Sequence, residues 1–532
     1  MPQSVKSADR SRGASSANGD GDDDFDRLPP DEHTRLLPNR VDSSRGMLTP
    51  DDPAVTPFNL WSIRLLRWVT IIFALVTFLW WVLVLVSTFA TLPGFHVRGG
   101  GFYAYGFASL ALANMLFTLL FFEVPSRSVR ILSLVMAFVL MVNMIILLAV
   151  QKTRYEEGWV GITSVVWALL LSLWTILVDR TVKWGKAEEE ERLTGRAETR
   201  RTLGEWLAVL LSSVGYTLMV VACVLTTLTI ILRALDAKLA PPGALYWVDG
   251  GKYRIHVHCR GGGGNATAAA ADGARQTTVL FEGGERPVED GLWQFAEAAL
   301  ENGSIGRYCF ADRPGIAWSD TAPSPLSAGF AVDALSEALA AAGERGPWVL
   351  ASAGIGSLYA RVFSARHGRD VRGILLVDPL HEDLLGPLAS PGRGFLLWLR
   401  GVLSPLGLDQ LPGALFRGRS SRDRVYGRSV QQTSKHIFAR LQESLVLGSF
   451  TRRDVGSSRQ IQDRSVPLAV VSSGQHIKDD HGWEAKQRDL TRLTDELLKW
   501  DIVDDAPPHV WKTEAGRDKM EARLRQLLKN KA

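Results

Sequence analysis

The feature that most constrains this chain is an uncharged apolar run at residues 69–92, "VTIIFALVTFLWWVLVLVSTFATL". At about 1.5 Å per residue, a helix of this length crosses a hydrocarbon layer of about 30 Å. Four further apolar runs long enough to cross the same layer follow at 102–122, 131–150, 158–178 and 206–232. Tryptophans lie near the ends of the runs, where interfacial aromatic belts form: Trp61, Trp68, Trp159, Trp184 and Trp206. We therefore expect five membrane-spanning helices within residues 58–240.

Composition sets the runs apart from the segment that precedes them. Residues 1–57 are rich in Ser, Asp, Arg and Gly and are expected to form a disordered tail, because such a segment buries too little apolar surface to offset the entropy of ordering. No positively charged n-region followed by an apolar h-region and a small-residue cleavage site opens the chain, so we expect no cleaved signal peptide and expect the first helix to direct insertion. The net charge of +4 gives no indication of a nucleic-acid partner. The three cysteines lack C-x-x-C spacing, and we expect neither a metal nor a cofactor.

Basic residues in the short loops predict the orientation of the helices. If the amino terminus is cytoplasmic, the cytoplasmic side holds eleven Lys and Arg residues and the other side holds five, which follows the positive-inside rule. The eleven are Arg64, Arg67, Arg127, Arg130, Arg180, Lys183, Lys186, Arg192, Arg196, Arg200 and Arg201; the five are Arg98, Lys152, Arg154, Arg233 and Lys238. The residues after about 239 are then expected to be lumenal or extracellular.

Two kinds of short motif agree with this orientation. Asn265 and Asn302 begin N-x-[ST] triplets, which accept glycans on the non-cytoplasmic face. In the tail, Glu32 stands four residues before Leu36 and Leu37. This spacing resembles an acidic dileucine sorting signal, which implies a sorting adaptor as a partner and delivery to a vacuole- or lysosome-like membrane. The alternative is a chance pair of leucines in a polar tail.

Polar residues inside the spans raise the alternative of a transporter. Asn114 and Asn143 would either line a path or form hydrogen bonds to a neighbouring helix. No Asp, Glu, Lys or Arg lies in the middle of a span, which argues against proton- or ion-coupled transport.

After "LAPPG" the pattern changes to short apolar runs that alternate with helical ones. "YRIHVHC", "TTVLFEGG", "RYCFADRPG", "WVLASAG", "GILLVDP" and "PLAVVSSG" are typical of strands, whereas "LWQFAEAAL" and "GFAVDALSEALAAAG" are typical of helices. Such alternation predicts right-handed crossovers and a mostly parallel sheet with helices on both faces. We expect this α/β domain to occupy residues 241–532.

Three segments of this domain resemble the α/β-hydrolases in order and spacing: "ADRPGIAWSD" at 311–320, "WVLASAGIGSLYARVF" at 348–363 and "ILLVDP" at 374–379. The resemblance implies an α/β-hydrolase fold over about 245–532. The whole layout, several membrane spans followed by this domain, is similar to an uncharacterised group of fungal multi-pass membrane proteins.

The second of these segments resembles the nucleophile elbow G-x-S-x-G, in which the middle residue attacks the substrate. Here that middle residue is Gly354, which has no nucleophilic atom. Ser352 lies two residues earlier on the strand, and Ser357 lies three residues later at the start of the helix. Neither serine reaches the tip of the elbow unless the register shifts. Glycine also removes the strain of a positive φ, as expected for a former enzyme that no longer needs its nucleophile.

The resemblance also assigns the remaining catalytic positions. "EGGE" occupies the loop that usually supplies an oxyanion-hole amide, so Glu282, Gly283 and Gly284 are expected to form the oxyanion loop together with the amide of Ile355. The general base is expected at His509, after the last strand. The acid is either Asp378, after the sixth strand, or Asp479 or Asp480, after the seventh; these alternatives stay open.

Residues 384–464 form an insertion at the place where hydrolases carry a lid. Its segment "RGFLLWLRGVLSPLGLDQLPGALF" is interrupted by Arg400, Pro405 and Pro412 and is too broken to span a bilayer. It predicts short amphipathic helices that cover the pocket or lie on the membrane. Cys259 and Cys309 lie on neighbouring strands, and whether they form a disulfide stays open.

These observations support two hypotheses. In the first, the protein is a multi-pass endomembrane protein with a lumenal, catalytically impaired hydrolase-like domain that binds a lipid-like molecule or a protein partner. In the second, it is an active esterase or lipase that uses Ser352 or Ser357 with His509 as the base.

Overall fold

The computed structural model describes residues 57–194, 202–262 and 277–529, and its amino-terminal part contains the five long helices that the sequence predicts. All five are long and apolar enough to cross a membrane. They are α1 (Trp61–Phe89), α2 (Phe102–Leu120), α3 (Arg127–Ala149), α4 (Gln151–Thr194) and α5 (Leu203–Asp236). The fourth begins earlier than predicted and is kinked at Gly158, whose φ of 59° is outside the helical range.

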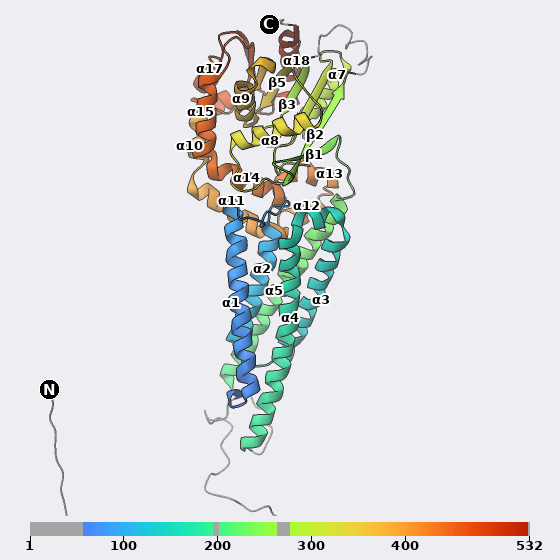
Figure 1. Ribbon diagram of the computed structural model, residues 1–532, viewed down its shortest axis with the longest axis vertical. Coiled ribbons are helices and arrows are strands. Elements are labelled where there is room, and N and C mark those ends of the chain that lie inside the picture. The colour runs from blue at the N-terminus through green and yellow to red at the C-terminus, as the bar shows by residue number, and fades with distance from the viewer. Residues whose placement is uncertain (1–56, 195–201, 263–276, 530–532) are drawn as a thin grey trace, which may run out of the picture.

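The five helices stand side by side as a bundle below the sheet (Figure 1). Asn114 lies inside the bundle and accepts hydrogen bonds from Tyr216 and Thr175, at 3.1 and 3.2 Å. Asn143 donates to the sulfur of Cys223 at 3.8 Å. Both amides therefore bind neighbouring helices, which is the second of the two roles that the sequence allows.

The second part of the chain forms one eight-stranded sheet in the order β1-β2-β4-β3-β5-β6-β7-β8. The strands are β1 (Ala244–Val248), β2 (Tyr253–Gly261), β3 (Thr278–Glu282), β4 (Arg307–Ala311), β5 (Trp348–Ala353), β6 (Val371–Val377), β7 (Leu468–Ser473) and β8 (Leu497–Val503). Strand β2 is antiparallel to β1 and β4, and all other pairs are parallel. The mostly parallel sheet predicted from the alternation of apolar runs is confirmed.

Side-chain alternation divides the core into two layers, one on each face of the sheet. Leu280 and Leu350 face the layer that contains α8 (Ala328–Ala341), α9 (Gly356–Arg366) and α15 (Arg452–Ile461). Val279 and Val349, one residue earlier on the same strands, face α7 (Leu292–Glu301) and α18 (Glu514–Lys529). Because helices cover both faces of the sheet, the strands are apolar along nearly their whole length.

The insertion between β6 and β7 folds into short helices, as the sequence predicts. They are α10 (Leu385–Leu388), α11 (Pro391–Leu403), α12 (Gln410–Phe416), α13 (Ser421–Val425), α14 (Ser434–Val446) and α15. In Figure 1, α11, α12 and α14 lie between the sheet and the upper end of the bundle. The packing is close: a Cβ built at Gly401 of α11 would lie 2.0 Å from the ring of Phe102 in α2.

Further contacts attach the insertion to the last membrane helix. Thr229 of α5 donates to the carbonyl oxygen of Pro405 at 2.7 Å. Arg424 of α13 pairs with Asp236, the last residue of α5, at 2.5 Å. The insertion is therefore packed against the membrane region as well as against its own domain.

Cys259 and Cys309 are directly opposite each other in the antiparallel pair β2–β4 and form a disulfide. The third cysteine, Cys223, is free and buried in α5.

Candidate functional site

The elbow predicted from the sequence has its expected backbone shape, with Gly354 at its tip. Gly354 directly follows the last residue of β5 and has a φ of +49°. One residue, Ile355, separates it from the start of α9. Its N–H donates to the carbonyl oxygen of Val377 at 3.1 Å, which places the elbow beside the end of β6. An ideal Cβ at this position would have the Cα of Gly284, at 3.8 Å, as its nearest neighbour. A side chain fits in the space, but glycine supplies no reactive atom.

The two serines near the elbow have other environments. Ser352 pairs in register with Glu282 and is directed toward the face covered by α8 and α9; its Oγ is buried, without a hydrogen-bond partner among the described residues. The Oγ of Ser357 is also buried, donates to the carbonyl oxygen of Gly354 at 2.7 Å and accepts from the N–H of Leu380 at 3.2 Å. Ser357 therefore braces the elbow backbone.

The predicted oxyanion loop is held by an arginine that the sequence analysis did not single out. The Nη1 and Nη2 atoms of Arg313 donate to the carbonyl oxygens of Gly283 and Gly284, at 2.6 and 2.8 Å. Glu282 is fully buried, and both of its carboxylate oxygens lack a hydrogen-bond partner within the described part of the chain. Burial raises the pKa of Glu282 to about 8, against the opposing effect of Arg313.

Arg313 in turn binds a buried acid from the insertion. Its Nε donates to Glu443 of α14 at 3.2 Å, and the same carboxylate accepts from the hydroxyl of Tyr359 at 3.0 Å and pairs with Arg440 at 3.1 Å. Burial alone would raise the pKa of Glu443, but Arg313 and Arg440 outweigh it and hold the pKa below its usual value. This network links the oxyanion loop to the lid.

The structure does not bring the predicted base and acids together. Asp378 accepts from Nδ1 of His476 at 2.7 Å, and its other carboxylate oxygen accepts from the indole of Trp483 at 3.0 Å. The ring of His476 stacks on Trp483 at a centroid distance of 3.7 Å. His476 follows β7, so the histidine that partners the acid after β6 is not the one predicted after β8.

His509 lies at the start of a short turn after β8, with its ring 5.1 Å from that of Trp511. No hydrogen bond or ion pair joins His509 to Asp378, Asp479 or Asp480 within the described ranges. Burial, with Lys512 and Arg286 nearby, lowers the pKa of His509. Asp479 ends α16 (Gly474–Asp479), and the exposed Asp480 accepts from the N–H of Gly482.

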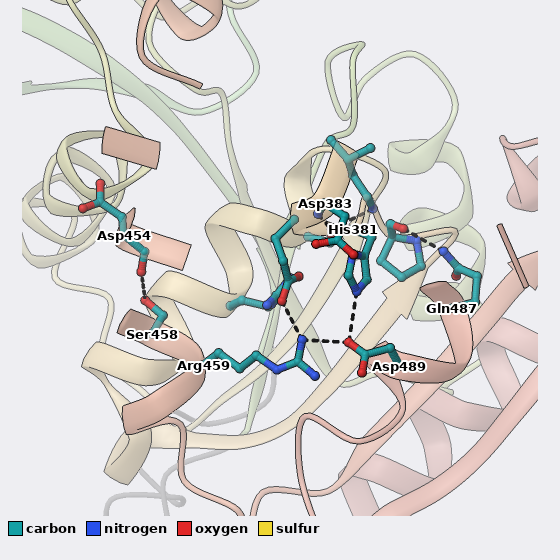
Figure 2. Close-up of polar contacts among 12 residues, drawn as sticks. His381, Asp383, Asp454, Ser458, Arg459, Gln487 and Asp489 are labelled. Carbon is teal, nitrogen blue, oxygen red and sulfur yellow. Dashed lines mark hydrogen bonds and ion pairs between the residues drawn. The ribbon is translucent and has the colours of Figure 1, made fainter. Parts of the chain in front are cut away.

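A second histidine–aspartate pair follows β6, as Figure 2 shows. Nε2 of His381 donates to Asp489 of α17 (Trp483–Leu490) at 3.0 Å, and its Nδ1 accepts from the N–H of Asp383. Arg459 of α15 bridges Asp489 and Glu382, at 2.7 and 2.6 Å. Every member is paired, so the cluster fastens the end of the insertion to the sheet.

A cavity of about 240 Å³ lies between the elbow side of the sheet and the insertion. Its walls combine aliphatic side chains from both sides with three arginines from α11 and α14 and two acids that pair with one of them, Arg440: Ile355, Leu380, Leu388, Leu397, Ile437, Leu447, Arg393, Arg400, Arg440, Glu285 and Glu443. His436 also lines it; burial lowers the pKa of this histidine to about 3, and its Nδ1 lacks a hydrogen-bond partner in the described chain. A second, largely apolar cavity of about 280 Å³ shares Arg400 and Ile437 with the first.

The structure thus adds residues that the sequence analysis did not identify. Arg313 lies in the segment "ADRPG" that carries the family resemblance, just after a predicted strand. Its position near the site could therefore have been predicted from the sequence. The cavity residues of α11 and α14 carry no comparable signal, because the fold of the insertion brings them to the elbow. Among the other predicted sites, Asn302 is exposed at the end of α7. Asn265 and the tail residues Glu32, Leu36 and Leu37 lie outside the described residues.

Comparison with known proteins finds relatives in two yeasts and similar solved structures. An uncharacterised protein of Schizosaccharomyces pombe is 31% identical, and the match covers 93% of this chain and 96% of the relative. An uncharacterised vacuolar membrane protein of Saccharomyces cerevisiae is 26% identical over 62% of this chain and 59% of its own length. Among solved structures, a carboxylesterase of the thaumarchaeon Nitrososphaera gargenis is 13% identical and covers 53% of this chain and 98% of its own, with a TM-score of 0.39.

A family model described as a region of unknown function (DUF2417) matches residues 32–259, from the tail to the second strand. The full-length relative extends the likeness over the sheet and the insertion. With its five apolar helices and its α/β-hydrolase fold, the chain belongs to this family of fungal multi-pass membrane proteins.

Proposed function

We propose that this protein is a multi-pass endomembrane protein whose hydrolase-like domain binds an anionic lipid and has lost serine-hydrolase catalysis. The observation that carries the proposal is the cavity between Ile355 of the elbow and the insertion, in which Arg393 and Arg400 lie among aliphatic side chains where a hydrolase would hold its substrate.

The loss of catalysis is supported by the elbow residues and by the surroundings of the predicted base. Gly354 offers no nucleophile, and Ser357 donates its hydrogen to the elbow carbonyl. His509 has no acidic partner among the three carboxylates expected to orient it, and a base without such a partner is poorly positioned. The alternative, an active hydrolase that uses Ser352 or Ser357, requires each of these contacts to rearrange.

The lining of the cavity supports an amphipathic anion as the ligand. Guanidinium groups bind phosphates with paired hydrogen bonds, whereas the leucines favour acyl chains. Arg393 is exposed on α11 and forms no ion pair in the described part of the chain. Arg400 pairs with Asp409 at 3.3 Å, on the surface, where such a pair contributes little. Both arginines are therefore available to a phosphate.

The position of α11 supports entry from the membrane. Trp398 packs on Phe89 at the end of α1 and on Tyr105 near the start of α2, with centroid distances of 6.2 and 6.4 Å. Phe395 and Leu396, on the same helix, are exposed. A helix that lies at the ends of the spans and exposes apolar side chains is suited to the membrane interface. A lipid then moves from the bilayer to the cavity without crossing water.

The same proposal places the amino terminus in the cytoplasm and the hydrolase-like domain in the lumen. The excess of Lys and Arg near the start of α1 and the end of α4 supports this orientation. The disulfide between Cys259 and Cys309 also supports it, since disulfides persist in oxidising compartments. The relative in Saccharomyces cerevisiae, a vacuolar membrane protein, supports a vacuolar location. Glu32, Leu36 and Leu37 in the tail of the present chain support delivery through a sorting adaptor.

Lipid binding is tested on the full-length protein in mild detergent with a fluorescent phosphatidic acid. Replacement of Arg393 and Arg400 together by glutamine should weaken binding about tenfold or more, because each charged hydrogen bond contributes about 1.5–3 kcal/mol. Arg369→Gln is the matched control, since Arg369 is exposed just before β6. It lies at the amino-terminal ends of the parallel strands, whereas the elbow lies at their carboxyl ends. Equal affinities in the wild type and the double variant would contradict the proposed site.

Orientation is tested independently by glycosidase digestion of protein made in a eukaryotic host. A mobility shift that is lost in the combined Asn265→Gln and Asn302→Gln variant is expected. Labelling of a cysteine introduced after residue 512 by an impermeant reagent, added to sealed vacuoles from the cytoplasmic side, would contradict the lumenal placement.

A further inference from the structure

A second polar cluster lies beside strands β2 and β4, apart from the lipid cavity. It consists of His256 on β2, Glu289 in the loop between β3 and α7, and Asp312 directly after β4. The side chains of all three are fully buried. His256 and Asp312 are neighbours across the antiparallel pair β2–β4, and the N–H of Asp312 donates to the carbonyl oxygen of His256 at 3.2 Å. Their side chains therefore share one face of the sheet.

Hydrogen bonding assigns the protonation of the imidazole. Nε2 of His256 donates to the carbonyl oxygen of Pro242, which can only accept. In a neutral ring, Nδ1 then carries a lone pair, and this lone pair faces a carboxylate oxygen of Asp312 at 2.8 Å and one of Glu289 at 3.9 Å. Three groups with lone pairs cannot face one another in a dry core unless a positive charge lies between them.

One carboxylate oxygen of Asp312 also accepts from the backbone N–H of Trp318 at 3.3 Å, but several oxygens of the cluster are unpaired. Both carboxylate oxygens of Glu289 and one oxygen of Asp312 lack a hydrogen-bond partner in the described part of the chain. No Lys or Arg among the described residues forms an ion pair with either carboxylate. A divalent cation would neutralise both carboxylates and leave the site with no net charge.

We propose that His256, Glu289 and Asp312 supply three ligands to a zinc ion. An imidazole that donates its other N–H to a backbone carbonyl is the arrangement that fixes a metal-binding histidine. Imidazole and carboxylate ligands suit zinc, whose bonds of about 2.0–2.2 Å place tetrahedral ligand atoms about 3.4 Å apart. The separations from Nδ1 of His256, 2.8 Å to Asp312 and 3.9 Å to Glu289, lie on either side of this value, so each carboxylate needs to shift by about half an ångström relative to the imidazole.

The position of the cluster suggests what the ion would do. Pro242 belongs to the linker that joins α5 to β1, so the imidazole that binds the ion also holds this linker. Asp312 precedes Arg313, whose guanidinium holds the oxyanion loop. The ion would therefore fix the strand ends that connect the membrane region to the lipid cavity.

The cluster of His381, Glu382 and Asp489 provides an internal comparison. It has the same three residue types at similar spacing, but a nitrogen of Arg459 lies 2.6 and 2.7 Å from the two carboxylates and supplies the cation (Figure 2). This second cluster is not expected to bind zinc.

The proposal is tested on full-length protein that carries no histidine tag and is purified from zinc-replete cells. Inductively coupled plasma mass spectrometry should find about one zinc per wild-type chain. Glu289→Gln, which keeps the side-chain volume, should reduce zinc content at least tenfold. The matched control Glu382→Gln should keep the wild-type zinc content.

Thermal unfolding of the wild-type protein tests the proposal even if Glu289→Gln does not fold. Unfolding of the wild type in the presence of a strong chelator should lower the midpoint, and added zinc should restore it. Wild-type protein that contains no stoichiometric zinc, together with a midpoint unaffected by chelator and by zinc, would overturn the proposal and assign a shared proton to the cluster. The lipid-binding assay is separate from both measurements, so failure of one proposal is distinguishable from failure of the other.

Discussion

Glu282 provides the sharpest test of the electrostatics around the elbow, because its carboxyl group is buried and has no hydrogen-bond partner among the described residues. Burial raises its pKa from 4.5 to about 8, so the folded state keeps a proton that the unfolded state releases above pH 4.5. The free energy of unfolding of the wild type therefore falls as the pH rises from 4.5 to 8. At about 1.4 kcal/mol per pH unit, the loss by pH 7 is about 3 kcal/mol.

Glu282→Gln removes this titration and keeps the shape of the side chain. We expect the variant to match the wild type near pH 4.5 and to exceed its stability by about 3 kcal/mol at pH 7. For a domain of this size, that difference corresponds to about 6–12 °C in the unfolding midpoint. The assay is a pH series of thermal unfolding on the full-length protein in detergent. The control is Glu301→Gln, at an exposed position at the end of α7.

A constant difference between Glu282→Gln and the wild type across this pH range would refute the reasoning. It would mean that Glu282 does not titrate between pH 4.5 and 8, and hence that a cation or bound water stabilises its charged form in the folded protein.

Three further predictions concern the elbow, the disulfide and the lid. Gly354→Ala should lower the free energy of unfolding by about 1–3 kcal/mol, measured by urea denaturation, because the φ of +49° strains a residue with a Cβ even where space is available; no loss of stability would contradict the assigned backbone conformation. Replacement of Cys259 and Cys309 by alanine should cost about 4 kcal/mol for a loop closed over a separation of 50 residues. Dithiothreitol should lower the unfolding midpoint of the wild type but not that of the double variant, and equal sensitivity would argue against the bond. Gly401→Ala should push α11 away from Phe102 at a cost of about 1–3 kcal/mol, detected as faster hydrogen exchange in α11; unchanged exchange would show that the helix is not packed there.

Much of the fold is predictable because its signals are local. Uncharged runs identify all five membrane helices, although α4 extends to Thr194 because its polar end continues the helix beyond the apolar run. The alternation of short apolar runs predicts the sheet, since each buried strand is nearly continuous in apolar residues. The elbow is also local: a strand, a glycine with positive φ and a helix follow within a few residues.

The partners of the elbow are much less predictable because they meet only in three dimensions. The contact between Asp378 and His476 joins residues 98 positions apart, and sequence reasoning selected His509 because of its place after the last strand. The same limit applies to the insertion, whose short helices are predictable but whose packing on Phe102 is not. The cluster of His256, Glu289 and Asp312 has no motif spacing, because the antiparallel pairing of β2 and β4 brings its members together.

The central claim is that the hydrolase-like site has lost its nucleophile. It is tested most directly by incubation of the folded, full-length protein with a fluorescent fluorophosphonate, which reacts with activated serines. The account predicts no labelling above that of heat-denatured protein, for the wild type and for Ser352→Ala and Ser357→Ala alike. Labelling of the wild type that either substitution abolishes would contradict the account and identify an active serine hydrolase.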